Sequence, residues 1–256
     1  MKIAIKATHL VPGGGLMHFN RITEWFGRLA PQTRFIVLAR DGQQHLFETV
    51  PNNFEYHYFN LPARNLATRI LWEKFKLPGI IEELKPDLLF EPGNYGTSGV
   101  SCPKVLLLHN IAPFDREFIR GEGLYQKIRL NLLRAATINS MRTSQGVIFL
   151  ADYVRGMLGD QFDPSRVRTS VIYHGRPQCG GTPDEVRILH ELGITGQFLL
   201  CVSHIYRYKK IREMVEAYLL ALKSNSNLPP LYIAGAPYDK SYARDIQKTI
   251  ERAGLE

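Results

Sequence analysis

The sequence predicts an α/β protein in which two parallel-sheet units follow one another along the chain. Short apolar runs, typical of buried parallel strands, alternate with longer segments whose apolar residues recur at helical spacing. With 256 residues and 45% hydrophobic content, the chain is long enough to bury one or two cores. The loosest stretch, residues 176–181, contains Pro and Gly, so we place the two domains at residues 1–180 and 181–256.

The first unit is expected to hold most of the strands. These are predicted at residues 3–7, 34–39, 54–59, 88–90, 104–108, 147–150 and 171–173. Helices are predicted at residues 16–29 and 124–141, and a mostly helical stretch at 61–84 is expected to break at Pro78. Asp152 is expected to cap the helix that follows the sixth strand.

The second unit is expected to repeat the strand-then-helix pattern twice. A strand at 198–202, apolar enough to be buried on both faces, precedes a helix whose apolar face would carry Ile211, Met214, Tyr218 and Leu222. A strand at 231–234 precedes a final helix carrying Tyr242, Ile246 and Ile250. The residues after 181 are fewer than the ~100–200 of an ordinary domain, so we expect the chain to end inside this unit.

Charge and cysteine content narrow the class of partner. The formal charge of +8 and pI near 9.4 favour an anionic partner, such as a nucleotide or an acidic membrane surface. The cations are scattered, which makes nucleic acid the weaker choice. Three cysteines far apart predict no disulfide framework or metal site. The N-terminus lacks a signal-peptide core and no run is long enough to span a membrane, so a cytoplasmic protein is expected, with peripheral contact at the inner membrane face left open.

The stretch from residue 198 to 222 is the strongest candidate binding site. Its strand leads into a basic and aromatic loop, residues 203–210, at a position where open α/β sheets bind ligands. In an extended loop Arg207 and Lys209 would point the same way and could grip a diphosphate, helped by the N-terminus of the next helix. The alternative is that both are solvated surface charges.

Three other loops follow predicted strands. Gly13, Gly14 and Gly15 come after the first strand and would let the backbone approach a ligand, although the pattern is neither G-x-G-x-x-G nor a phosphate-cradling loop and a flexible turn is the alternative. His109 ends a buried strand and can donate to a phosphate or sugar hydroxyl, or simply be satisfied by a loop carbonyl. The loop at 91–96 ends a further strand.

The stretch at 61–84 mixes basic residues with Leu, Ile, Trp and Phe. Such an amphipathic segment can rest on an anionic membrane surface. More often its apolar stripe packs on the sheet and the charges are solvated, so both interpretations remain open.

Taken in order, these segments resemble the retaining GT-B glycosyltransferases of family 4. The resemblance covers essentially the whole chain and stops within the family's second lobe, which implies a complete N-terminal Rossmann-like domain and a partial C-terminal one. It rests on the glycine triplet after the first strand, on His109-Asn110 where the family often has His-Asp, and on a hinge pattern at 172–175. The segments at 69–78 and 85–87 are similar to members acting on polysaccharide and lipopolysaccharide acceptors.

The resemblance implies roles for individual residues. His109 would position the sugar or acceptor as the catalytic residue, while Gly14, Gly15, Arg207 and Lys209 would bind the donor diphosphate. His174 and Gly175 at the hinge, with Gly235, would serve the donor base, and we assign Asn94 and Tyr95 to the acceptor. The donor would be a UDP- or GDP-linked sugar, transferred with retention to a glycan or lipid-linked glycan in cell-surface polysaccharide synthesis, with the nucleotide-sugar as a substrate and no cofactor.

No metal requirement is implied, because GT-B enzymes offset the leaving diphosphate with cations and a helix N-terminus. The chain also contains no Asp-x-Asp, which disfavours the metal-dependent GT-A class. No acidic pair stands in for the family's paired glutamates, which the resemblance places after Glu256. Two alternatives remain. One is a non-catalytic glycosyltransferase-like protein that binds an acceptor or partner. The other is a dinucleotide-dependent oxidoreductase, supported only by Arg40-Asp41 near the end of the second strand, which could contact a ribose.

Overall fold

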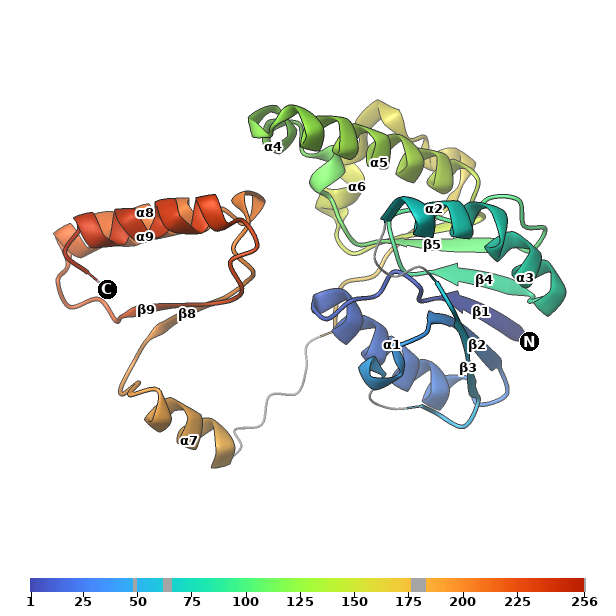
Figure 1. The fold of residues 1–256 in the computed structure, drawn as a ribbon, viewed down its shortest axis with the longest axis horizontal. Coiled ribbons are helices and arrows are strands. Elements are labelled where there is room, and N and C mark those ends of the chain that lie inside the picture. Colours follow the sequence, from blue (N-terminus) through green and yellow to red (C-terminus); the bar gives the residue numbers. More distant parts are fainter. Residues whose placement is uncertain (48–49, 62–65, 176–182, 256) are drawn as a thin grey trace. The chain divides into compact units, whose positions relative to one another are not determined.

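The chain forms two compact units, Met1–Gly175 and Arg176–Glu256, which are described separately (Figure 1). The computed structural model describes residues 1–47, 50–61, 66–175 and 183–255. The predicted boundary at 180/181 lies outside these residues.

The first unit is built on one seven-stranded sheet in the order β3-β2-β1-β4-β5-β6-β7, with every neighbouring pair parallel. The direction of winding reverses between β1 and β4, which is the topological switch point of the sheet. The strands are β1 (Lys2–Lys6), β2 (Arg34–Arg40), β3 (Phe54–Phe59), β4 (Leu88–Glu91), β5 (Lys104–Leu108), β6 (Gly146–Phe149) and β7 (Arg168–Val171).

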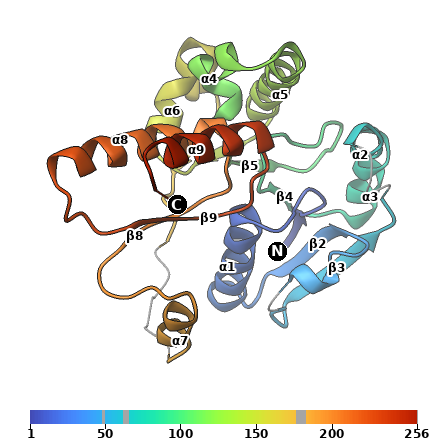
Figure 2. The same cartoon turned by 60° about the vertical axis from the view of Figure 1, so that its left-hand side comes forward.

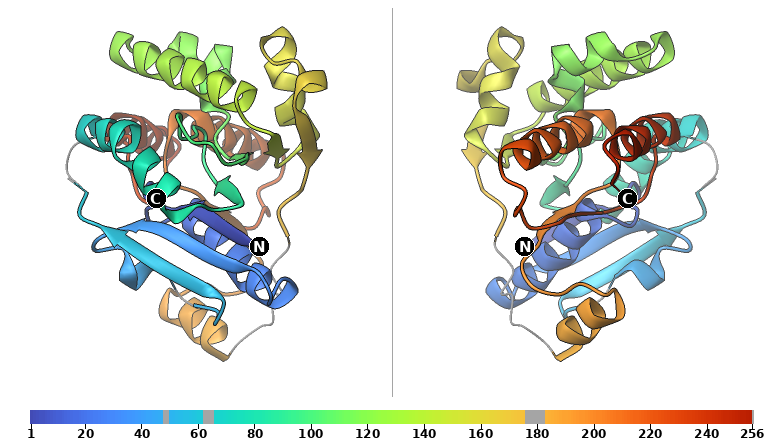
Figure 3. Two further views of the ribbon diagram at one scale, coloured as in Figure 1. Left: turned by 90° about the vertical axis from the view of Figure 1, so that its right-hand side faces the viewer. Right: turned by 90° about the vertical axis from the view of Figure 1, so that its left-hand side faces the viewer.

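Helices cover both faces of this sheet, as Figures 1 and 3 show. On one face α1 (Gly14–Leu29) packs its Phe19 and Phe26 against the apolar side chains of β1, β2 and β3. On the other face lie α2 (Leu66–Phe75) and α3 (Leu77–Leu84), and further along it α5 (Leu124–Arg142) and α6 (Asp152–Leu158). The short helix α4 (Arg116–Gly121) and four 3₁₀ turns among the described residues complete the unit: η1 (Gln44–Leu46), η2 (Ala112–Phe114), η3 (Gly159–Gln161) and η4 (Pro164–Arg166).

A buried ion cluster joins β1 to β4 at the switch point. Lys6 Nζ lies 3.5 Å from Glu91 Oε1 and 3.7 Å from Glu73 Oε2, and it donates to the Tyr95 carbonyl at 3.0 Å. The three charged side chains are at most 6% exposed. Burial alone would lower the pKa of Lys6, but Glu91 and Glu73 outweigh it, so the pKa is raised and the ammonium stays charged.

The second unit holds a two-stranded parallel sheet, β8 (Leu199–Val202) and β9 (Leu231–Ala234). Both α8 (Ile211–Ser224) and α9 (Lys240–Arg252) pack on one side of it (Figure 2), through Ile211, Val215, Tyr242 and Ile246. The Tyr242 hydroxyl accepts the Arg212 N–H, which ties the two helices together. The unit also contains α7 (Pro183–Glu191) and the turn η5 (Arg207–Lys209).

Most predicted elements are confirmed, and the strands at 54–59, 104–108 and 231–234 match residue for residue. The last strand of the first unit was predicted too late: β7 ends at Val171, and Ile172 and Tyr173 are exposed beyond it. The prediction followed the apolar residues at 171–173, whereas the strand itself has the largely polar sequence Arg-Thr-Ser-Val.

Three local predictions were wrong. Asp152 does not cap α6: Ala151 is the cap residue, and Asp152 instead pairs with Arg155 and accepts the Tyr173 hydroxyl. The helical stretch at 61–84 breaks at Lys76, and Pro78 sits in the first turn of α3, where a missing N–H costs nothing.

The third wrong prediction concerns β8, which is not buried on both faces. Leu199, Leu200 and Val202 are 45%, 56% and 76% exposed. Within the described residues, β8 pairs with β9 alone and helices pack on one side only. No helix in the described parts of the chain has the length and apolar content to cross a bilayer.

Replacing Lys6 with Met tests whether the ion cluster supports the first unit. The change leaves two buried carboxylates without their cation, so we expect the free energy of unfolding to fall by about 3–5 kcal/mol. Trp25 and Trp72, the two tryptophans of the chain, both lie in the first unit, so their fluorescence during urea unfolding reports on it alone. Lys74→Met on the exposed side of α2 is the matched control and should change stability little. Equal effects of the two variants would contradict this account.

Candidate active site

Loops that follow four strands bring polar side chains to one edge of the large sheet. Because all seven strands are parallel, their carboxyl ends share this edge, where open α/β sheets bind ligands. His9 follows β1, the segment at 92–95 follows β4, His109 follows β5 and His174 lies shortly after β7.

Three histidine rings meet at this edge. His18 Nδ1 lies 3.1 Å from His109 Nε2, and the rings of His18 and His174 are 4.2 Å apart at their centroids, edge to face. One ring nitrogen from each of the three residues lies within 4.8 Å of the others. We call His18, His109 and His174 the histidine cluster.

Two members of the cluster, His18 and His109, are electrically neutral at physiological pH. Burial, and then the neighbouring His174, lower the pKa of His18 to about 4. Burial also lowers the pKa of His109 to about 4, with smaller contributions from the other cluster histidines and His9. In the pair formed by His18 and His109, one neutral ring therefore donates and the other accepts. His109 can offer a ligand a hydrogen bond or a lone pair, but not a positive charge.

Sequence reasoning missed His18. The predicted helix at 16–29 already contained this residue, one turn after the glycine triplet. A helix that starts at the carboxyl end of β1 keeps its first turns near the ligand-binding edge, and this was the available signal.

The glycine triplet is the start of α1 itself. Gly13 is the N-cap residue, with φ of +142°, a conformation that favours glycine. Gly14 and Gly15 form the first helical turn, and a Cβ added at either would meet no atom within 4 Å. Among the described residues no side chain caps this helix, so its first N–H groups are open to an anionic ligand.

The predicted acceptor residues hold the loop after β4 in place. The Asn94 side chain donates to the Asn110 carbonyl and accepts the Asn110 N–H at 2.7 Å, which fixes the residue next to His109. The Tyr95 ring lies 4.6 Å from Lys6 Nζ, and its hydroxyl accepts from Arg69 at 3.4 Å. Through these contacts Asn94 and Tyr95 fix the position of the loop after β4 at the ligand-binding edge of the sheet.

In the second unit the part of the basic loop that carries both cations, Arg207–Lys209, is a 3₁₀ turn and not the extended segment considered from the sequence. Arg207 Nε lies 3.2 Å from Asp239 Oδ2, so its charge is partly offset. Lys209 has no carboxylate partner among the described residues, and its ammonium lies 5.1 Å from the centre of the Tyr208 ring. Lys209 is therefore the more available cation of the two.

Gly235 has a steric role at the end of β9. A Cβ at this position would lie 2.0 Å from the Ser203 carbonyl oxygen, so only glycine lets the loops after β8 and β9 approach. Gly175 ends the first unit and a Cβ there would meet nothing within 4 Å.

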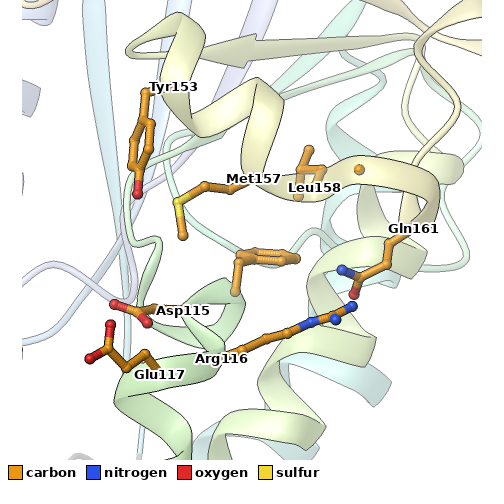
Figure 4. Close-up of a pocket in the computed structure, with 9 residues that line it drawn as sticks. Asp115, Arg116, Glu117, Tyr153, Met157, Leu158 and Gln161 are labelled. Atoms are coloured by element: carbon orange, nitrogen blue, oxygen red, sulfur yellow. The ribbon is translucent and has the colours of Figure 1, made fainter.

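A pocket of about 400 Å³ lies beside the segments that follow β5 and β6 (Figure 4). Figure 4 shows the carboxylates of Asp115 and Glu117 at one end, with the Tyr153 hydroxyl directed toward them, and Arg116 extending toward Gln161 at the other end. Carboxylates next to an aromatic ring can bind the hydroxyl groups and the apolar face of a sugar.

No family model and no curated protein sequence matches the chain. Solved structures do match. HepE of Anabaena in complex with UDP-glucose is 19% identical, with a TM-score of 0.65, over 100% of this chain and 67% of that chain. Sucrose-phosphate synthase of Thermosynechococcus elongatus is 12% identical, with a TM-score of 0.69, over 100% and 68%. WaaG, a glycosyltransferase involved in lipopolysaccharide biosynthesis, is 16% identical, with a TM-score of 0.64, over 99% and 69%.

The chain therefore has the fold of the GT-B glycosyltransferases, as the resemblance in the sequence predicted. At these identities the likeness shows the fold alone. The chain spans about two thirds of the length of each of these three proteins.

The buried His9 makes the stability of the first unit depend on pH, which tests the structure at this edge of the sheet. Its Nε2 lies 2.8 Å from the Pro92 carbonyl, and burial, followed by the charge of Lys6, lowers its pKa to about 3. In the unfolded chain this histidine has its ordinary pKa near 6.5. Between pH 6.5 and 3 the unfolded chain therefore binds a proton at His9 that the folded chain does not bind. Stability is thus fully present above pH 6.5 and is lost as the pH falls toward 3.

Between pH 6.5 and 5 this single group should remove about 1.6 kcal/mol of unfolding free energy. Urea titrations followed by tryptophan fluorescence, with EDTA present, measure the change. His9→Gln keeps a donor for the Pro92 carbonyl but does not titrate, so its loss over the same range should be smaller by about this amount. Identical slopes for the two proteins would show that His9 is not buried in its neutral form.

Proposed function

We propose that the chain belongs to a glycosyltransferase of the family 4 type, which moves a sugar with retention from a UDP- or GDP-linked donor to a glycan or lipid-linked glycan. The observation that supports it most directly is the fold shared with HepE, whose structures hold UDP-glucose or UDP. The histidine cluster and the open start of α1 lie at the edge of the sheet where such a fold binds ligands.

In this proposal the acceptor hydroxyl attacks the anomeric carbon on the face from which the diphosphate leaves. The bond from that carbon to the diphosphate oxygen breaks, the bond to the acceptor oxygen forms, and the acceptor proton passes to the departing diphosphate. Lys209, supported by Arg207, stabilises the charge that develops on the leaving group. No metal is required for this step.

His109 contacts the sugar or acceptor as a neutral hydrogen-bonding group, held by Asn94 through the backbone of Asn110. The pocket next to α4, with Asp115, Glu117 and Tyr153, is our candidate for part of the acceptor site, since its groups match those that bind sugar hydroxyls. A role in cell-surface polysaccharide synthesis belongs to this proposal and is supported by the likeness to WaaG.

Calorimetric titration of the purified chain with UDP, GDP and ADP, alone and as sugar conjugates, tests the donor site. We expect one diphosphate to bind, and Lys209→Ala to weaken it about tenfold or more through the lost charge-assisted contact. Lys223→Ala, at the exposed end of α8, removes the same charge elsewhere and should leave the affinity unchanged. If no nucleotide binds the folded chain at millimolar concentration, the donor site is absent from it.

The second candidate is a glycosyltransferase-like protein that binds an acceptor or partner without turnover. The finding in its favour is that the chain spans about two thirds of its structural neighbours. Release of free nucleoside diphosphate from the bound donor in the presence of acceptor glycans, followed by mass spectrometry, separates the two, because only the transferase releases it.

Peripheral contact with an anionic membrane is part of the proposal. Leu124, Ile128 and Leu132 follow one another at four-residue spacing along α5, and all three are exposed. The same helix carries Lys and Arg but no Asp or Glu. On α2, within the stretch where the sequence raised this possibility, Ile70, Leu71 and Phe75 are exposed as well.

Sedimentation with lipid vesicles tests the membrane contact. The chain should sediment with vesicles rich in anionic lipid and remain in solution with zwitterionic ones. Replacing Leu124, Ile128 and Leu132 by Ser should abolish most of the binding, whereas Leu220→Ser, at an exposed leucine of α8, should not. Equal binding of both vesicle types would exclude an electrostatic membrane site.

A further inference from the structure

The histidine cluster has no structural explanation beyond one hydrogen bond. Its residues come from three separate segments: the second turn of α1, the end of β5 and the segment after β7. Among the described residues, none of the three forms an ion pair with a carboxylate, and their ring contacts are with one another. His174 is exposed, so burial of apolar surface does not explain why its ring lies against the other two.

The spacing of the ring nitrogens suits a metal ion. Imidazole nitrogens bind zinc at ~2.0–2.1 Å, so two of them on one tetrahedral ion lie about 3.3–3.4 Å apart. His18 Nδ1 and His109 Nε2 are 3.1 Å apart, close to this separation. All three nitrogens lie within 4.8 Å, and the exposed His174 can rotate about its side-chain bonds to close the remaining gap.

The donor set indicates the kind of metal. Imidazole suits zinc, copper, nickel and iron, whereas magnesium, calcium and manganese prefer carboxylate and carbonyl oxygens. The cluster offers three imidazole nitrogens and no carboxylate within the part of the chain that the structure describes. Three protein ligands also leave a fourth tetrahedral position free, as in open zinc sites.

We propose that His18, His109 and His174 form a three-imidazole site for a divalent transition metal of the zinc type, with the fourth position open to water or an anionic ligand. Metal binding at this site requires neither a nucleotide nor a sugar. The ion takes His109 Nε2, the atom that faces His18 Nδ1, and holds the ring in place, so His109 is no longer free to contact a sugar. A metal bound here would therefore inhibit the proposed sugar transfer, and it takes no part in that reaction.

The simpler account is that His18 and His109 share a hydrogen bond and nothing more. That account predicts no stoichiometric metal binding and no role for His174. The two accounts differ in what happens when zinc is added to the protein without nucleotide, so the outcome does not depend on whether the chain transfers sugar.

Calorimetry on the tag-free chain, stripped with EDTA and dialysed, provides the test. Titration with Zn²⁺ should show one equivalent bound, and Co²⁺ should give the intense visible absorption of a tetrahedral site. Replacing any one of the three histidines by Ala should weaken zinc binding by at least ~100-fold, because a direct ligand is lost. His45→Ala and His204→Ala, at exposed histidines outside the cluster, should leave it unchanged.

Circular dichroism and tryptophan fluorescence in EDTA identify variants that do not fold. His174 is exposed, so His174→Ala keeps the core intact and remains a valid test if a variant at His18 or His109 misfolds. The thermal midpoint of the wild-type chain should rise on adding Zn²⁺, and that of His174→Ala should not. Absence of one-equivalent binding, or an equal loss in His45→Ala, would overturn the proposal.

Discussion

The parallel arrangement of the seven-stranded sheet is the constraint on which the rest of the first unit depends. Parallel pairing from β3 to β7 sends every strand's carboxyl end to the same edge. It thereby brings together the start of α1, His109 after β5 and His174 after β7, although more than 150 residues separate the first from the last along the chain. A change in the register of β1, β5 or β7, which precede the three histidines, would move one ring away from the others.

The Lys6, Glu73 and Glu91 cluster holds this edge together at the switch point. It links β1, α2 and β4 directly below the loops that carry the site, and Glu91 also accepts both the N–H and the hydroxyl of Thr97. A charge so deeply buried is tolerated only while its partners remain in place. The pairing therefore specifies the position of the β4 loop, and through Asn94 and Asn110 the position of His109.

Much of the fold could be predicted from the sequence because buried parallel strands are continuous apolar runs. The strand at 104–108 is such a run after its first residue, Lys104, whereas β7 is polar and its position was misassigned. The site was harder to predict because its contacts join distant segments. His109 was found as the residue after an apolar strand, but its neighbour His18 is hidden in a helix, and the partner of Arg207, Asp239, lies 32 residues further on. Lys6 was also missed, since nothing in an apolar strand shows that its charge has buried partners.

Hydrogen exchange of the chain with and without its nucleoside diphosphate tests the central claim most directly, because it locates the ligand without assuming which residues bind it. The account predicts slower exchange of backbone amides at residues 203–210 and 235–239, and at the open start of α1 when the sugar conjugate is used. Protection confined to other segments, with these loops exchanging as in the free protein, would contradict it.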